Sequence, residues 1–124
     1  MIYLGINDMM TLGKHLILEL WGAQGSLPFW QMDEAAEVLK RAAIDAGATV
    51  LSERWHHFGE GCGYTGVVVL SESHISVHTW PEHGYAALDV FMCGVADPML
   101  TIPAIEKFYR PHRIETTLLE RGKK

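Results

Sequence analysis

The chain has 124 residues and a formal charge of −5, and this length favours one compact domain over two. Hydrophobic residues make up 48% and charged residues 20%, a globular composition that excludes a disordered chain. The acidic balance argues against a nucleic-acid partner, because phosphates require a basic surface. The two cysteines, Cys62 and Cys93, are too few for a disulfide scaffold and indicate a reducing compartment.

Targeting signals are not visible in the sequence. Residues 1–10 contain neither a basic region nor a long apolar stretch, so we expect no secretory signal. No uninterrupted run of about 18 apolar residues occurs, so we also expect no membrane-spanning helix. These features predict a cytoplasmic protein without a membrane partner.

Hydrophobic periodicity predicts six strands and two helices. Apolar residues recur at helical spacing after Asp33 and Glu34, and Gly47 ends that pattern. A second helix begins at Asp97-Pro98, a typical N-cap followed by proline. In chain order we predict a strand over 15–21, a helix over 33–46, strands over 49–58, 65–70, 75–80 and 85–93, a helix over 97–109 and a strand over 114–119.

This order of elements predicts an α+β fold with two helices packed on one face of a mainly antiparallel sheet. The helices cover one face only, so the second face and the sheet edges need other cover. We therefore expect the chain to associate with itself.

Reactive side chains concentrate between Ser71 and Cys93, and residue chemistry alone leaves three interpretations open. His74 and His78 share strand parity and could bind zinc with His83 or Cys93, although this spacing matches no closed zinc pattern. Cys93 and His78 could form a thiolate pair for nucleophilic catalysis. Alternatively, these residues are ordinary members of half-buried strands.

A resemblance to a known family adds a further interpretation. The run ESHISVHTWPE over 72–82, followed by GYAA over 84–87, DVF over 89–91 and CG over 93–94, resembles the small prokaryotic S-adenosylmethionine decarboxylases. Gly13-Lys14-His15-Leu16 is similar to that family's opening Gly-Arg-His-Leu.

The resemblance covers residues 12–94 and is looser over the C-terminal helix and strand. It implies the sandwich fold of that family and a pyruvoyl-dependent carboxy-lyase.

The resemblance implies that the chain is a proenzyme that cuts itself at Glu72-Ser73. A β chain, 1–72, and an α chain, 73–124, would result. The Ser73 hydroxyl would attack the preceding carbonyl in an N-to-O acyl shift, and elimination and hydrolysis would leave a pyruvoyl group at residue 73. That ketone would take up the α-amine of the substrate and accept the electron pair released with CO₂.

The family pattern also implies roles for other residues. His78 and Thr65 would assist self-processing, and Cys93 would act as the general acid that protonates the carbanion. No metal is implied, and His74, His83 and Cys62 receive no role. Three residues are candidates for substrate binding, namely Phe58, which would stack on adenine, Trp80 and Glu82.

The spacing of Ser73 and His78 creates a geometric requirement. They lie five residues apart, so a regular strand would point their side chains to opposite faces. We therefore expect the chain to bend or break between them, with a kink, a bulge or a chain end at Ser73.

The sequence departs from the family just before Thr65. Relatives carry Pro-x-Gly-Val-Ser-Gly there, whereas this chain has Gly-Cys-Gly-Tyr-Thr-Gly over 61–66. The favoured substrate is S-adenosylmethionine, for polyamine (spermidine) synthesis, and the alternatives are L-ornithine or L-arginine, or an uncleaved non-catalytic binding module. Relatives are homodimers with sites at the subunit boundary, which implies a homodimer of cleaved protomers with Phe58 acting across it.

Overall fold

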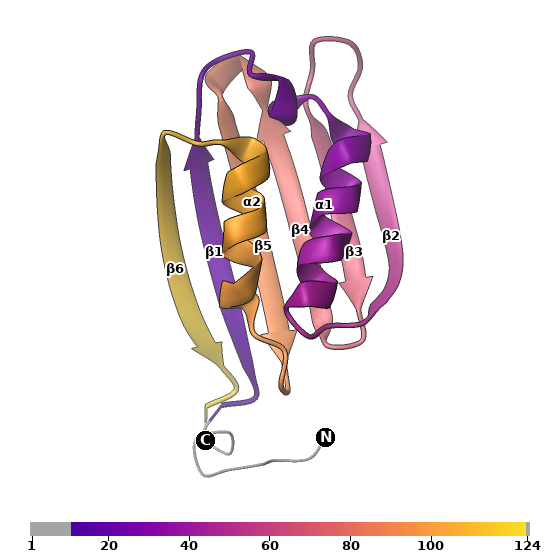
Figure 1. The fold of residues 1–124 in the computed structure, drawn as a ribbon, viewed down its shortest axis with the longest axis vertical. Coiled ribbons are helices and arrows are strands. Elements are labelled where there is room, and N and C mark those ends of the chain that lie inside the picture. Colours follow the sequence, from indigo (N-terminus) through magenta and orange to yellow (C-terminus); the bar gives the residue numbers. More distant parts are fainter. Residues whose placement is uncertain (1–10, 124) are drawn as a thin grey trace.

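A computed structural model describes residues 11–123 of the chain (Figure 1). Residues 1–10, from which we inferred that no secretory signal is present, lie outside the described part. The order of strands and α-helices is the predicted one, and the last helix is preceded by a 3₁₀ turn over Pro98–Thr101. The elements are β1 (Gly13–Trp21), α1 (Met32–Asp45), β2 (Val50–His57), β3 (Tyr64–Leu70), β4 (Ser73–Trp80), β5 (Tyr85–Cys93), α2 (Ile102–Tyr109) and β6 (Arg113–Arg121).

The six strands form one sheet in the order β2-β3-β4-β5-β1-β6, and each neighbouring pair is antiparallel. Both α-helices lie on the same face of this sheet (Figure 1). The predicted α+β class is therefore confirmed. Hairpins connect β2 to β3, β3 to β4 and β4 to β5. The first strand, β1, pairs with β5 on one side and with the last strand, β6, on the other.

Alternation along the strands directs one set of side chains under the helices. Leu16, Leu18 and Leu20 of β1 are fully buried there, while the residues between them are partly exposed. Each such leucine contributes about 2 kcal/mol through removal of its apolar surface from water. The helices cover this core with residues such as Leu39 and Tyr109, both fully buried.

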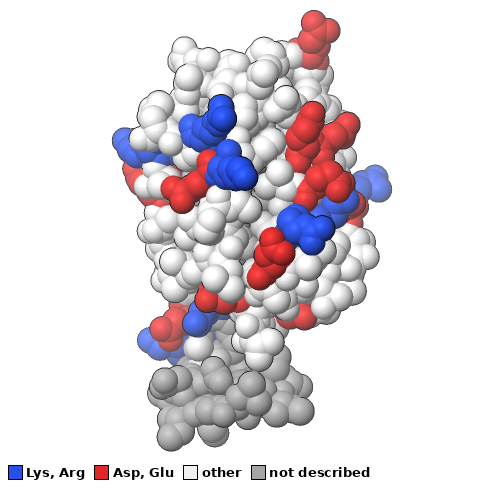
Figure 2. All heavy atoms as spheres, in the orientation of Figure 1, with Lys and Arg blue, Asp and Glu red and all other residues white. Residues whose placement is uncertain are grey.

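The helix face carries both signs of charge. Figure 2 shows acidic and basic side chains interspersed over this face. Lys40 of α1 lies 2.9 Å from a Glu37 oxygen and 2.8 Å from a Glu53 oxygen on β2, so one amine joins the helix to the sheet edge. Within residues 11–123, no helix is long and apolar enough to cross a membrane.

No helix within residues 11–123 covers the opposite face of the sheet, which carries a chain of polar contacts. Asp89 accepts hydrogen bonds from Ser76 Oγ, at 3.2 Å, and from His15 Nε2, at 2.8 Å. Arg121 donates to His15 Nδ1 at 3.2 Å, and a guanidinium can only donate. The proton of a neutral His15 therefore lies on Nε2, and the contacts link β6, β1, β5 and β4, with His15 and Ser76 both donating to Asp89.

Candidate active site

The turn between β3 and β4 places Ser73 in a strained backbone conformation. Leu70 pairs with Ser73, so only Ser71 and Glu72 form the turn. Ser73 has a φ of 142°, a positive value that costs a non-glycine residue about 1–3 kcal/mol. The strained residue is the serine that the family resemblance marks for conversion.

The carbonyl group between Glu72 and Ser73 is held by the neighbouring strand. The backbone N–H of Cys93 donates to the Glu72 carbonyl oxygen at 3.1 Å. Ser73 pairs with Met92, the residue before Cys93, so the ladder between β4 and β5 fixes this approach. A bound N–H polarises a carbonyl and stabilises negative charge that develops on its oxygen.

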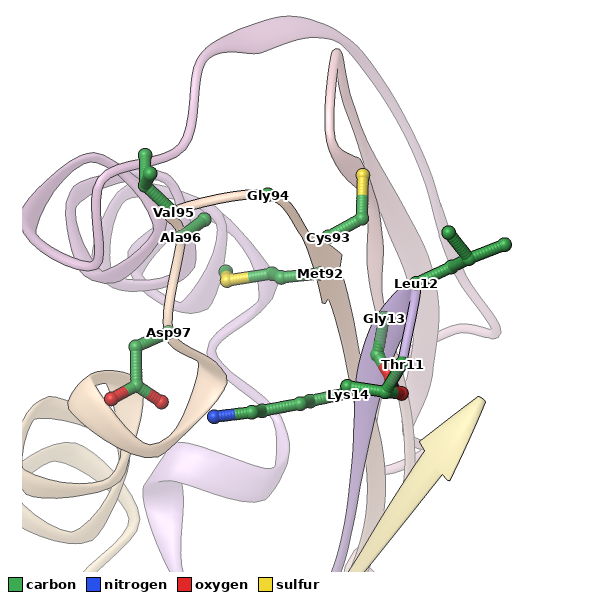
Figure 3. Close-up of a pocket in the computed structure, with 10 residues that line it drawn as sticks. All are labelled: Thr11, Leu12, Gly13, Lys14, Met92, Cys93, Gly94, Val95, Ala96 and Asp97. Carbon is green, nitrogen blue, oxygen red and sulfur yellow. The ribbon is translucent and has the colours of Figure 1, made fainter. Parts of the chain in front are cut away.

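Cys93 ends β5 beside a cavity of about 310 Å³ that is lined by residues 11–14 and 92–97. Its thiol is free and half-buried. Figure 3 shows the sulfur pointing away from Lys14 and Asp97, which lie together on the other side of the strand. The thiol therefore belongs to the uncovered face, in agreement with strand alternation.

Thr65 and His78 form a second cluster further along the sheet. They are direct partners in the β3–β4 ladder, and Thr65 Oγ1 lies 2.5 Å from His78 Nδ1. The two residues that the resemblance assigns to self-processing are therefore in contact with each other.

The remaining predicted residues lie beside this second cluster. A cavity of about 360 Å³ is lined by Phe58, Thr65, His78, Trp80 and Glu82. Phe58 is 60% exposed, and Trp80 stacks on Tyr85 with ring centroids 5.2 Å apart. The five side chains thus bring aromatic surface, one carboxylate and the Thr65–His78 pair to a single opening.

The structure separates the predicted site into two clusters. The ladders on both sides of β4 are regular from Ser73 to His78, so a bend between these residues is wrong, whereas the backbone at Ser73, where we expected a kink, is irregular with a φ of 142°. The irregularity lies at Ser73 itself, where the tight turn ends and the strand begins. Five residues of strand place Ser73 and His78 about 16 Å apart along β4. The φ of 142° takes Ser73 out of the regular alternation of the strand, so alternation does not assign its side chain to a face.

The same geometry excludes two of the early interpretations. His74 and His78 are four strand residues apart, about 13 Å, which is too far to bind one zinc ion. His78 pairs with Ala87, six residues before Cys93 on β5, so His78 and Cys93 cannot form a thiolate pair within one chain. Across residues 11–123, no group of three His, Cys, Asp or Glu side chains is arranged to hold a metal.

Sequence reasoning missed the contacts that hold the turn. The Cys93 amide donates to the carbonyl oxygen of Glu72, and the Thr49 amide donates to its side chain. The sequence separation of these partners is 21 and 23 residues, so no local pattern marks them. The His15–Asp89 contact was also missed, although alternation places both residues on the uncovered face.

Comparison with known proteins identifies the family of the chain. The family model described as S-adenosylmethionine decarboxylase matches residues 14–122. A protein of Methanococcus maripaludis strain S2, named S-adenosylmethionine decarboxylase proenzyme, is 50% identical over 115 residues, which cover 92% of this chain and 93% of the relative. A protein of the same name from Thermomicrobium roseum is 40% identical, covering 92% of this chain and 97% of the relative.

A solved structure supports the same assignment. The crystal structure of the adenosylmethionine decarboxylase from Aquifex aeolicus aligns with a TM-score of 0.79 and 36% identity, covering 93% of this chain and 94% of that one. The fold and these relatives define the chain as a decarboxylase, that is, a carboxy-lyase. It belongs to the S-adenosylmethionine decarboxylase family.

Proposed function

We propose that the chain is a proenzyme that cuts itself between Glu72 and Ser73 and then decarboxylates S-adenosylmethionine for polyamine synthesis. The observation that supports this most directly is the strained φ of Ser73, next to a carbonyl already bound by the Cys93 amide. Family membership and the names of the relatives favour this substrate over ornithine and arginine, and a decarboxylase over a binding module.

Self-cleavage uses atoms of this turn. Ser73 Oγ bonds to the Glu72 carbonyl carbon, the C–N bond breaks, and the nitrogen takes the hydroxyl proton, which leaves an ester. The ester then eliminates: residue 73 loses its Cα proton, its Cβ–O bond breaks, and the chain 1–72 leaves with a main-chain carboxylate at Glu72. Residue 73 becomes dehydroalanine. Addition of water and release of ammonia leave a pyruvoyl group at the new N-terminus of the chain 73–124. The Cys93 N–H would hold the oxygen that becomes negative in the first step.

The residues around Ser73 fit such a group. Once formed, it would supply an electrophilic carbonyl for the substrate's α-amine and an electron sink for the pair left by CO₂. Cys93 lies on the adjacent strand beside this position, with a free, half-buried thiol that can hold a proton for the carbon that lost CO₂. We propose Ser73 and Cys93 as the catalytic residues.

The second cluster is proposed to bind the substrate and to assist cleavage. Phe58 and Trp80 offer rings for the adenine and the sulfonium, since aromatic faces attract both flat rings and cations. Glu82 offers a carboxylate that can accept hydrogen bonds from ribose hydroxyls. The Thr65–His78 pair offers a hydroxyl and an imidazole for proton transfer during self-cleavage.

Two copies of the chain can bring the clusters together. The uncovered face carries partly exposed apolar residues, including Ile17, Val67 and Phe91. A two-fold axis lying in the plane between two such faces, and running across the strands, would pack the faces together and set the Ser73 end of one copy against the His78 end of the other. We therefore propose a homodimer of cleaved protomers in which each site uses Ser73 and Cys93 of one protomer and Phe58, Thr65 and His78 of its partner.

Denaturing mass spectrometry tests the proposed cleavage. We expect two fragments, residues 1–72 and 73–124, with the second blocked by a ketone at its N-terminus. Ser73→Ala should give one intact chain, because no hydroxyl remains to attack the carbonyl. CO₂ release should occur with S-adenosylmethionine and not with ornithine or arginine. An uncut wild-type chain, or no CO₂ from S-adenosylmethionine, would contradict the proposal.

A further inference from the structure

The side chain of Glu72 is bound to a fixed backbone donor. The N–H of Thr49, in the junction between α1 and β2, donates to Glu72 Oε1 at 2.8 Å. The carbonyl of the same Thr49 accepts from the N–H of Ser71 at 3.0 Å. Both backbone groups of one residue therefore bind the two-residue turn that precedes Ser73.

The junction that carries Thr49 is itself held in place. The Ala46 carbonyl, at the end of α1, accepts from the Asp97 N–H at 3.0 Å, which joins the junction to the loop that follows Cys93. Ala46 and Ala48 are 3% and 8% exposed and belong to the core. The Thr49 amide thus occupies a defined position relative to both the turn and the end of β5.

Charge strengthens the contact between Glu72 and Thr49. Partial burial acts to raise the pKa of the Glu72 carboxyl, but hydrogen bonds from the Thr49 amide, the Ser71 hydroxyl and its own amide together hold that pKa below the usual value. The side chain is therefore a carboxylate at neutral pH, and hydrogen bonds to a carboxylate are stronger than bonds to a neutral acceptor.

Glu72 is consequently held at both of its polar groups. Its side chain binds Thr49 on one side, and its carbonyl oxygen binds the Cys93 N–H on the other. These two anchors limit rotation about the bonds between the side chain and the carbonyl, so the plane of the peptide before Ser73 is set. Intramolecular attack depends strongly on such orientation.

We propose that Glu72 is a positioning residue for self-cleavage: its side-chain oxygen, bound to the Thr49 amide, aims the Glu72 carbonyl at the Cys93 amide and presents it to Ser73. This inference rests on the proposed self-cleavage and explains why an acidic residue precedes the serine. The bond that breaks needs only a carbonyl, which any residue would supply, whereas the reach to Thr49 needs a long side chain that ends in an acceptor.

Three variants separate reach from charge. Glu72→Gln keeps the length and an Oε1 acceptor but removes the charge. Glu72→Asp keeps the charge but withdraws the carboxylate by one methylene, and Glu72→Ala removes the acceptor. The rate of fragment formation is followed by denaturing electrophoresis after cell-free synthesis of each full chain, with the exposed Glu106→Ala as the control for loss of one negative charge.

We expect Glu106→Ala to cut at close to the wild-type rate, and Glu72→Gln, which keeps the acceptor but loses the charge, to cut at a rate between those of the wild type and Glu72→Ala. Glu72→Asp and Glu72→Ala should cut about 10- to 100-fold more slowly, since a hydrogen bond to a charged group contributes about 1.5–3 kcal/mol and about 1.4 kcal/mol is a tenfold change in rate. Thermal unfolding is compared in a Ser73→Ala background, where every chain stays uncut. There, adding Glu72→Asp should leave the melting temperature nearly unchanged and increase hydrogen exchange at the Thr49 amide.

The outcomes distinguish this inference from the proposed function. An uncut wild-type chain would contradict self-cleavage itself. A wild-type chain that cuts, together with Glu72→Asp and Glu72→Ala chains that cut equally fast, would overturn the positioning role alone. A Glu72→Gln chain that cuts as slowly as the Glu72→Ala chain, at an unchanged melting temperature, would also overturn it, because the charge and not the reach to Thr49 would then be the required property.

Discussion

At the scale of single residues, the backbone and the side chain of Cys93 have separable tasks. The N–H binds the Glu72 carbonyl, while the thiol stands free beside Ser73's strand. Cys93→Ala removes the thiol and keeps the N–H, so we expect self-cleavage to persist. CO₂ release from S-adenosylmethionine should fall by about 10²–10⁴-fold, the range for loss of a positioned general acid.

The two activities are measured on the same Cys93→Ala preparation, by fragment mass and by CO₂ release. Cys93→Ser serves as a control that keeps a proton donor of similar size but much weaker acidity. A Cys93→Ala chain that remains uncut would show that the thiol, and not the N–H alone, acts in cleavage. A cut chain with full CO₂ release would remove Cys93 from the decarboxylation step.

At the scale of elements, Gly66 lets β2 and β3 pack at the end of the sheet near Thr65. A Cβ at this position would lie 2.1 Å from Trp55 Cε3, and the indole ring cannot move aside without disturbing its contact with Tyr64. We expect Gly66→Ala to lower the free energy of unfolding by about 1–3 kcal/mol, as overpacked cores do. The melting temperature of the Ser73→Ala chain, with and without Gly66→Ala, measures the effect.

Ser52→Ala on the exposed side of β2 is the matched control and should change stability by less than about 0.5 kcal/mol. A Gly66→Ala chain as stable as this control would show that β2 relaxes away from the sheet. It would also mean that the second cluster does not depend on close packing of the two strands.

Elements with a strong local pattern were predictable from the sequence. Helix α1 has helical spacing of apolar residues and acidic residues at its start, and β5 has clean alternation of buried and exposed positions. The position of β1 between β5 and β6 was not predictable, because strand order depends on pairing between residues far apart in sequence. The start of β4 at Ser73, instead of residue 75, depends on the tight turn, which periodicity does not report.

The candidate site was predictable as a set of residues and not as an arrangement. The motif around Ser73 and Cys93 marks them by resemblance, and five other predicted residues do line one cavity. Motif spacing carries no information on distance in space. The separation of about 16 Å between the two clusters follows only from the regular pairing of β4 with its neighbours in the structure. The Thr49–Glu72 contact depends on how the end of α1 meets the β3–β4 turn, which is a tertiary feature.

At the scale of the whole molecule, a site shared by two protomers makes a quantitative prediction. Chains with Cys93→Ala lack a working first cluster, and chains with Phe58→Ala lack a working second cluster, so each variant alone should release little CO₂. In a mixed dimer, one site combines both defects and the other combines both intact clusters. Random pairing of two co-expressed variants gives half mixed dimers, so the mixture should recover about one quarter of wild-type activity.

The measurement uses two affinity tags, one on each variant, to isolate the mixed dimer, which should then show about half of the wild-type CO₂ release per dimer. Whether the mixed dimer releases CO₂ depends on whether each active site takes Cys93 and Phe58 from two protomers or from one. If Cys93 and Phe58 of the same chain served one site, the mixed dimer would contain one defect in each site and would be as inactive as the single variants. Restored activity requires that the Ser73–Cys93 cluster of one protomer works with the Phe58 cavity of its partner.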